Sequence, residues 1–411
     1  MGSRAFSSSG WRRAKSLGLY LADGIQQSGA GADGVIRFGV GQVDVYALAA
    51  PACMFGSTGR KVSRGKNYAR QLLAFIRSAN AAPLMNGAPI NSNGAEVPRP
   101  SEMLVFHSML RIASVAQGMI TKGQPMIRHL PMFLSGLTAG RSLPSIAPQP
   151  FRDILPTIKQ DVPNPKGKIA IFTGCLLDFV YVDIATDVVK ALNMAGYIVE
   201  MPLGQACCGA PATYMGDVEN AKKAAELNLN AMEAEKYDYI VSACPTCTHA
   251  LRDYVDFFKD DPEMLKKAEE LRSKTFDFCK LVSMLGGLPD TGDGVPMKVT
   301  YHDSCHLNRY LGVTKEQREL LKATKGVELI EMHDCDKCCG FGGSYSVKFP
   351  EMSAPILEEK INNIVASGAD VVAVDCPGCL LQIRGGLDAR GLNNIQVKHT
   401  AQIVVEKREK K

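Results

Sequence analysis

From residue 168 onward, short runs of β-branched and aliphatic residues alternate with longer segments in which apolar side chains recur every three or four positions. The short runs predict buried strands, and the longer segments predict amphipathic helices. Strands that alternate with helices are typical of an α/β domain built on a parallel sheet. The predicted elements of the first block are 168–172, 183–195, 197–201, 217–235 and 239–242.

One predicted helix shows its packing face clearly. Within segment 217–235, Ala221, Ala225, Leu229 and Met232 share one stripe, and lysines and glutamates occupy the opposite side. An apolar stripe on a charged helix is the side that packs against the core. We therefore expect this helix to cover one face of the sheet.

The same order of elements returns after segment 288–296, which is rich in Gly, Asp and Pro. The elements of this second block are 298–301, 327–332, 356–366 and 371–374. A breaker-rich segment between two similar blocks indicates a domain boundary. The sequence thus predicts an α/β protein with two duplicated parallel-sheet lobes, residues 167–290 and 291–411, related by a pseudo-twofold axis.

The residues before the lobes carry weaker patterns. Residues 1–100 are rich in Gly, Ala and Ser and predict a loop-rich leader. Within 101–166, apolar spacing up to residue 133 predicts a helical scaffold, and the prolines of 143–165 predict an extended connector. The amino-terminal region is therefore expected to be partly helical and poorly defined.

The overall composition narrows the class of protein. A chain of 411 residues that is 46% hydrophobic and 22% charged is typical of a soluble globular protein with cores of its own. The net charge is only +5, and the Lys and Arg residues are spread along the chain, which argues against nucleic-acid binding. The apolar runs are short or interrupted by polar residues, so we expect no transmembrane span.

Cysteine content points to the compartment. The chain has 13 cysteines and no hydrophobic signal-peptide core. Such a chain is expected in a reducing compartment, and we predict a cytoplasmic location. In that setting, clustered cysteines indicate metal or redox chemistry rather than structural disulfides.

Ten of the 13 cysteines form two sets with almost the same spacing. Each set has a single cysteine, then an adjacent pair, then a C-x-x-C pair. Cys305 follows Cys175 by 130 positions, and Cys379 follows Cys247 by 132, so the sets repeat with the lobes. The two sets are Cys175, Cys207, Cys208, Cys244 and Cys247, and Cys305, Cys338, Cys339, Cys376 and Cys379.

Each cysteine group comes just after a predicted strand. Parallel strands place their carboxyl ends on one edge of the sheet, where open α/β folds form their sites. Five sulfurs can therefore meet at a pocket in each lobe. Glycines beside the cysteines, such as Gly209 and Gly340, let the backbone approach a bulky group.

The number of cysteines favours an iron-sulfur cluster over zinc. A structural zinc site takes four ligands, and each set has one more than that. Adjacent cysteines point apart, so they serve one small ion poorly, whereas a cluster several ångströms wide can accept both. Structural zinc and metal-free thiol chemistry are the alternatives.

Other residues near the sets are open to interpretation. Cys335 is a bystander, a resolving cysteine or an alternative ligand, and Cys53 and Cys279 are expected to be buried small hydrophobes. Four polar residues could tune a cluster or relay protons, although histidines with ordinary partners are the commoner case. These four are His249, His302, Asp303 and His306.

At these residues the chain resembles the cysteine-rich CCG domain family, known from heterodisulfide reductase and from iron-sulfur subunits of glycolate, glycerol-3-phosphate and lactate oxidising systems. The resemblance covers about residues 167–404 and both cysteine sets. It implies two [4Fe-4S] clusters, of the cubane or the non-cubane type, with all ten cysteines as ligands. Segments 204–209 and 341–343 look most like the lactate-utilisation and glycolate oxidase branch.

The amino-terminal part departs from the long members of this family. Many of them carry two ferredoxin motifs there, whereas residues 1–174 of this chain contain only Cys53. Either another subunit holds the ferredoxin clusters, or the amino-terminal part is truncated or mistranslated. Segment 128–152 resembles the tail of a companion lactate-utilisation subunit, which indicates a fused arrangement.

The resemblance implies an oxidoreductase subunit that transfers electrons within a 2-hydroxyacid (lactate or glycolate) dehydrogenase or oxidase complex. The implied partners are a flavin-containing dehydrogenase subunit and a ferredoxin-type iron-sulfur subunit, with peripheral membrane association only through them. One alternative is a catalytic subunit, similar to heterodisulfide reductase, that reduces a disulfide at a cluster. Another is a structural zinc protein that serves as an interaction module.

Overall fold

The computed structural model describes residues 126–127, 143–289 and 294–409. The predicted leader 1–100, including Cys53, lies outside these residues, as do the helices predicted within 101–133. Most of the described chain belongs to one compact unit, which contains both sheets. Residues 212–218, which include the end of helix α8 (Ala210–Tyr214), do not belong to this unit.

The first lobe, residues 167–289, is built on a four-stranded sheet in which all neighbouring strands run parallel. Across the sheet the order is β4 (Ile198–Glu200), β3 (Lys168–Ile171), β5 (Tyr239–Ser242) and β6 (Thr275–Asp277).

The second lobe, residues 294–409, has a parallel sheet with the same topology. Across the sheet the order is β8 (Val327–Leu329), β7 (Met297–His302), β9 (Val371–Val374) and β10 (Gln396–Lys398). The strands of the two sheets therefore correspond one to one, which confirms the predicted duplication.

The central strands are buried because helices cover both faces of each sheet. All four residues of β9 are buried, as are three of the four in β3 and in β5. Such continuous burial is typical of parallel strands and explains their β-branched, aliphatic composition. On β3, Ile169 and Ile171 pack toward the other lobe, and Ala170 packs on the opposite face.

The helices follow the strands in the predicted alternation. Those before and within the first lobe are α5 (Phe151–Ile154), η3 (Leu155–Thr157), α6 (Gly174–Phe179), α7 (Val182–Met194), α9 (Val218–Met232), η4 (Ala234–Lys236), α10 (Pro245–Asp253), η5 (Tyr254–Phe257), α11 (Pro262–Lys274) and α12 (Phe278–Met284). Those of the second lobe are η6 (His306–Tyr310), α13 (Glu316–Lys322), α14 (Ser344–Lys348), α15 (Pro350–Ser367), α16 (Pro377–Ala389) and α17 (Thr400–Glu406). A two-stranded ribbon, β1 (Met126–Ile127) with β2 (Leu143–Pro144), precedes them.

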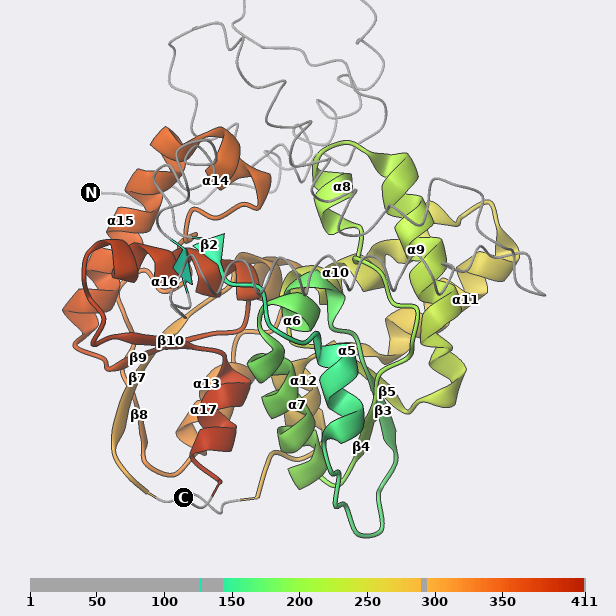
Figure 1. Ribbon diagram of the computed structural model, residues 1–411, viewed down its shortest axis with the longest axis horizontal. Coiled ribbons are helices and arrows are strands. Elements are labelled where there is room, and N and C mark those ends of the chain that lie inside the picture. The colour runs from blue at the N-terminus through green and yellow to red at the C-terminus, as the bar shows by residue number, and fades with distance from the viewer. Residues whose placement is uncertain (1–125, 128–142, 290–293, 410–411) are drawn as a thin grey trace, which may run out of the picture. The chain divides into compact units, whose positions relative to one another are not determined.

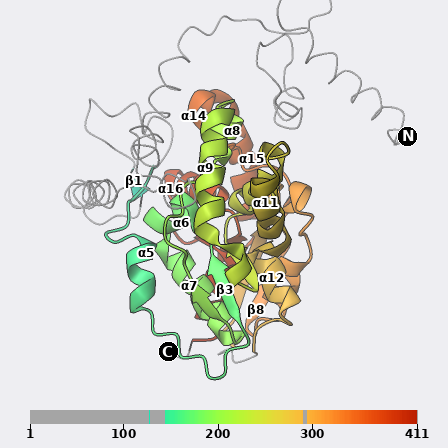
Figure 2. The ribbon, with the colours of Figure 1, turned by 90° about the vertical axis from the view of Figure 1, so that its right-hand side faces the viewer.

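The helix patterns agree with the sequence, with one shifted boundary. All four residues of the predicted stripe on α9 are buried, and Figure 2 shows α9 and α11 in front of the first lobe. Helix α15 begins at Pro350, earlier than the predicted 356, because Pro350 supplies the fixed φ that suits a first helical turn. It ends before Gly368, whose φ of 67° terminates the helix in the left-handed conformation.

Four helices join the two lobes. Helix α7 packs against α17, and α13 packs against α12. Because α7 corresponds to α13 and α17 to α12, the two contacts are copies of each other, as a pseudo-twofold axis requires. Figure 1 shows these helices between the two sheets. Their apolar side chains share one core, which includes Val188, Leu281, Leu320 and Val404.

Candidate metal centre

The strands and helices place the cysteines at the carboxyl edge of each sheet. Cys175 lies in the first turn of α6, just after β3, and Cys305 precedes η6, just after β7. Cys244 and Cys376 are the residues immediately before α10 and α16, so the C-x-x-C pairs lie at the starts of these helices. The predicted position after strands is therefore what the structure shows.

The loop with the adjacent cysteines of the first lobe is held by helix α9. Asn228 accepts a hydrogen bond from the Ala206 amide (2.8 Å) and donates to the Cys207 carbonyl (2.9 Å). The Tyr254 hydroxyl donates to the Cys208 carbonyl at 3.0 Å and accepts from Asn228. All of these backbone groups thereby have partners, which fixes the direction of both cysteines.

The corresponding loop of the second lobe depends on a glycine. Gly340 has a φ of 82°, and a Cβ built there would lie 2.7 Å from the Ser353 carbonyl oxygen on α15. The Ser353 hydroxyl donates to the Gly340 carbonyl at 2.7 Å, and the Gly340 amide donates to the Cys338 sulfur at 3.3 Å. Only glycine combines this backbone conformation with so close a contact.

The thiols of the first set lie within reach of one another. The neighbouring thiol of Cys207 is the main reason that the pKa of Cys175 is raised. The thiols of Cys207 and Cys247 lower the pKa of Cys208 to about 6, although burial opposes this. A buried sulfur with a lowered pKa favours the thiolate, which is the form that binds metals.

The second set is arranged in the same way. The pKa of Cys339 is lowered well below its usual value, first by the thiols of Cys338 and Cys379. Burial, followed by the charges of Cys376 and Cys339, raises the pKa of Cys305 to about 11. Cys338 is exposed and Cys305 half-buried, so this set reaches the surface.

The two sets adjoin each other at the lobe interface. The pKa of Cys376 is lowered well below its usual value, with the Cys244 thiol of the first lobe as the largest cause and Cys379 next. Helix α10 of the first lobe also contacts η6 of the second. The sequence predicted one pocket in each lobe, whereas the structure brings the two pockets side by side.

Buried polar atoms beside the cysteines test whether a cofactor fits. The hydroxyls of Thr173 and Ser304 and both ring nitrogens of His302 are buried, with no hydrogen-bond partner among the described residues. Leaving such a group unpaired costs about 1–3 kcal/mol. An unpaired imidazole beside two of the sulfurs, together with ten clustered thiols, suits an iron-sulfur group, whose sulfurs accept hydrogen bonds.

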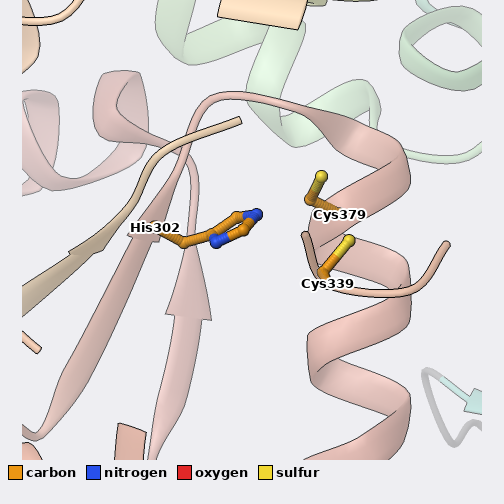
Figure 3. A group of neighbouring side chains, drawn as sticks. All are labelled: His302, Cys339 and Cys379. Atoms are coloured by element: carbon orange, nitrogen blue, oxygen red, sulfur yellow. The ribbon is translucent and has the colours of Figure 1, made fainter. Parts of the chain in front are cut away.

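His302 is the candidate polar residue closest to the sulfurs. Its ring nitrogen and the sulfurs of Cys339 and Cys379 all lie within 4.8 Å of one another, and all three residues are buried. Figure 3 shows the imidazole at the end of β7, directed toward the two sulfurs.

The other two histidines line the lobe interface. His249 of α10 and His306 of η6 both stack on Tyr310, with ring centroids 4.6 and 5.2 Å away. The Nδ1 atom of His306 lies 3.7 Å from the Cys305 sulfur and 3.4 Å from the Thr246 hydroxyl. Burial lowers the pKa of both histidines, which keeps them neutral near pH 7.

Asp303 and Cys335 form a separate cluster. Arg318 pairs with Asp303 at 2.8 Å and with Glu331 at 2.6 Å, and its guanidinium lies over the Tyr301 ring. The Cys335 sulfur donates to Asp303 at 3.4 Å. These contacts give Asp303 a structural partner and hold Cys335 within an ion-pair network.

A buried network behind the second set was missed by sequence reasoning. Asp375 accepts a hydrogen bond from the Tyr301 hydroxyl at 2.6 Å and lies 3.6 Å from the Cys279 sulfur. His399 caps α17 and lies 3.2 Å from the Asp375 carbonyl oxygen. Cys279 is buried as predicted, but its partner is a carboxylate from the other lobe.

The comparisons agree with this fold. The cysteine-rich domain family CCG matches residues 169–252 and 299–384, one copy in each lobe, so the fold and sites define a protein with two CCG domains. Lactate utilization protein A of Shouchella clausii is 39% identical over 240 residues, which cover 58% of this chain and 99% of that protein. The Bacillus subtilis protein of the same name is 36% identical over 238 residues, 58% of this chain and 98% of that protein. The chain belongs to the lactate utilization protein A family.

A structural comparison and the character of the helices complete the description. A solved structure of a hypothetical protein from Helicobacter pylori aligns with a TM-score of 0.44 and 11% identity, over 64% of this chain and 54% of that chain. Among the described helices, none combines the length and the apolar character that crossing a membrane requires.

Proposed function

We propose that this chain is an iron-sulfur electron-transfer subunit of a complex that oxidises lactate or a similar 2-hydroxyacid. The observation that carries the proposal is the gathering of ten thiols into two adjoining sets at the sheet edges. Membership in the lactate utilization protein A family supports the assignment to lactate metabolism. A cytoplasmic location is part of the same proposal.

The ten cysteines would serve as the ligands, five for each centre. Iron-sulfur clusters would supply one-electron oxidation and reduction. The chain itself contributes burial, since most of the thiols are shielded from water, and it contributes donors such as the Gly340 amide. Both features adjust the potential of a bound cluster.

Membership in the lactate utilization protein A family supports partners in a multi-subunit system. The described residues offer sulfur ligands for electron transfer, and the 2-hydroxyacid must be oxidised elsewhere in the complex. We assign that step to a flavin-containing dehydrogenase subunit, and the onward path to a ferredoxin-type iron-sulfur subunit.

Iron analysis tests the metal assignment. Anaerobically reconstituted protein should be brown and hold about eight iron atoms per chain, with matching sulfide. Cys208→Ser and Cys339→Ser should each lower the iron content by about half, because each removes a central sulfur from one set. Cys279→Ser, outside both sets, is the control. Colourless protein that holds zinc would contradict the assignment.

Electron transfer is tested with the partner subunits. In the assembled complex, lactate should reduce the clusters of this chain, as measured by electron paramagnetic resonance. Removing the flavin-containing subunit should abolish the reduction, because no hydride-accepting group is expected in this chain. Reduction of this chain by lactate without that subunit would contradict the relay function.

The exposure of Cys338 favours a second candidate function. This exposed sulfur brings the second set to the surface, where a disulfide substrate could reach it. The function would then be disulfide reduction at the second-lobe centre. Turnover of a disulfide by the isolated, reconstituted chain with an artificial electron donor would support this second function. Absence of turnover would contradict it and favour electron transfer.

A further inference from the structure

His302 is a buried imidazole without a partner. It is the last residue of β7, it is 1% exposed, and neither ring nitrogen has a hydrogen-bond partner among the described residues. An unpaired buried donor or acceptor costs about 1–3 kcal/mol. A side chain kept at this cost needs an explanation at the site that it faces.

The imidazole faces two cysteines of the second set. Its nitrogen lies within 4.8 Å of the Cys339 and Cys379 sulfurs, which come from the cysteine loop and from α16. In Figure 3 the ring extends from the strand end into the space beside both sulfurs.

The first lobe has a phenylalanine at the equivalent position. The offset of 130 residues that relates Cys175 to Cys305 pairs Phe172 with His302. Phe172 is fully buried, and a Cβ built at Gly174 would lie 3.4 Å from its ring and 3.1 Å from the Cys247 sulfur. Its ring and the sulfur of Cys247, the counterpart of Cys379, therefore both lie beside Gly174 in one buried cluster. The phenyl ring occupies the same place but has no N–H to donate.

Two arguments make the imidazole a hydrogen-bond donor rather than a metal ligand. The second set already supplies five sulfurs, enough for the four terminal positions of a four-iron cluster. A histidine that binds a metal almost always donates its other N–H to a nearby acceptor, and His302 has no such acceptor among the described residues.

We propose that His302 donates a hydrogen bond to a sulfur of the second-lobe centre, and that this bond makes the second-lobe centre easier to reduce than the first-lobe centre. The proposal rests on the proposed function, because it requires a cluster in each lobe. An N–H donor stabilises the extra negative charge that a reduced cluster carries on its sulfurs. Phe172 gives the first-lobe centre no such bond. Electrons that enter the chain therefore reduce the second-lobe centre first.

Exchanging the two residues tests the proposal. In a redox titration followed by electron paramagnetic resonance, His302→Phe should make the second-lobe centre harder to reduce. The expected change is about tenfold in the equilibrium constant for reduction, or about 59 mV for a one-electron couple. Phe172→His should shift the first-lobe centre in the opposite direction. His302→Gln keeps an N–H donor and should shift the second-lobe centre less than His302→Phe does.

Spectroscopy with labelled histidine gives an independent measurement. The electron paramagnetic resonance signal that Cys339→Ser removes should show weak coupling to nitrogen-15 in histidine-labelled protein, and His302→Phe should abolish this coupling. Strong coupling, of the size that a directly bound imidazole gives, would overturn the donor role. A full iron content with unchanged potentials in His302→Phe would also overturn it.

Stability without metal separates this role from a purely structural one. Since neither ring nitrogen has a hydrogen-bond partner among the described residues, His302→Phe should leave the unfolding temperature of the metal-free protein unchanged or raise it. A large decrease would show that His302 serves the fold. Failure to incorporate iron into the unsubstituted chain would instead refute the proposed function, so the two failures are distinguishable.

Discussion

At the scale of single residues, the structure identifies positions where one atom decides whether a site can form. At Gly340, a side chain would meet both an unfavourable φ and a backbone oxygen. The cysteine loop and α15 are in contact there, so a displaced backbone would move Cys338 and Cys339 together.

The first prediction concerns Gly340→Ala. A left-handed φ costs an L residue about 1–3 kcal/mol, and here the added methyl group must also displace the Ser353 carbonyl. We expect a loss of stability of more than about 2 kcal/mol in denaturant unfolding, with about half of the iron lost. Gly391→Ala is the matched control, because Gly391 has a φ of 70° but nothing within 4 Å of a built Cβ. Equal effects of the two variants would show that the contact with Ser353 is unimportant.

The sequence predicted the placement of the cysteines better than that of the residues around them. The spacing identifies ten cysteines at strand ends, and the structure brings them together. The sequence named His302 only as one of four polar residues that could tune a cluster. It could not single out His302, because an unpaired nitrogen is a property of the packed structure. One signal was available: the offset of 130 residues pairs His302 with Phe172, so the lobes differ at this position.

At the scale of elements, helices do more than cover the sheets. Helix α9 packs its apolar stripe on the first sheet, and it also presents Asn228 to the cysteine loop. Packing of the helix and placement of the ligands are thus linked by one buried amide.

The second prediction concerns this amide. Asn228→Ala leaves the Ala206 amide and the Cys207 carbonyl without their partner, and we expect a loss of about 2–3 kcal/mol of stability. The first-lobe signal should weaken while the second-lobe signal persists. Asn230→Ala, on the same helix, removes only a contact with Lys267 and is the control. An unaffected first-lobe signal in Asn228→Ala would contradict the proposed coupling of helix and loop.

The third prediction concerns pH and helix α7. Burial raises the pKa of Asp187 to about 6 from its usual 3.8, although Lys190 opposes the shift. The folded state therefore holds a proton that the unfolded state releases, and stability falls as pH rises from about 4 to about 6. Asp187→Asn should leave stability at pH 4 nearly unchanged and raise it at pH 7 by about 1–2 kcal/mol.

Unfolding by urea at several pH values measures this effect. Asp161→Asn, at an exposed position, should leave the pH dependence as it is in the unsubstituted protein. A loss of stability at pH 7 in Asp187→Asn would contradict this prediction. It would show that the Asp187 carboxylate forms a favourable ion pair and that its pKa is not raised.

Element prediction from sequence worked where patterns are long. Three strands of each sheet and the α9 stripe follow from the apolar pattern. Strands β6 and β10 do not, because each has a single apolar residue between two polar ones. Helix α11 was also not predicted, and it has no counterpart between α16 and β10 of the second lobe.

At the scale of the whole described unit, duplication produces a paired site. The contact of α7 with α17 and its copy, α13 with α12, bring the two sheet edges together. The position of Cys244 beside Cys376 is a consequence of that packing. The cysteine spacing within each lobe predicts a pocket in that lobe. The distance between the two pockets depends on how the faces of four helices pack together, and the cysteine spacing does not determine that packing.

The last prediction follows from the adjoining sets. Because the thiol of Cys244 interacts with Cys376 across the lobe interface, the two centres should influence each other when both are reduced. We expect the electron paramagnetic resonance spectrum of the fully reduced protein to show splitting or broadening that is absent when only one centre is reduced.

Cys376→Ser should alter the first-lobe signal as well as the second, because it changes the sulfur next to Cys244. Cys338→Ser is the matched control: Cys338 is exposed and belongs to the outer part of its set, so this substitution should leave the first-lobe signal unchanged. If both variants leave the first-lobe signal as it is, and the fully reduced spectrum is the sum of two separate signals, the lobes act as independent carriers despite the contact between Cys244 and Cys376.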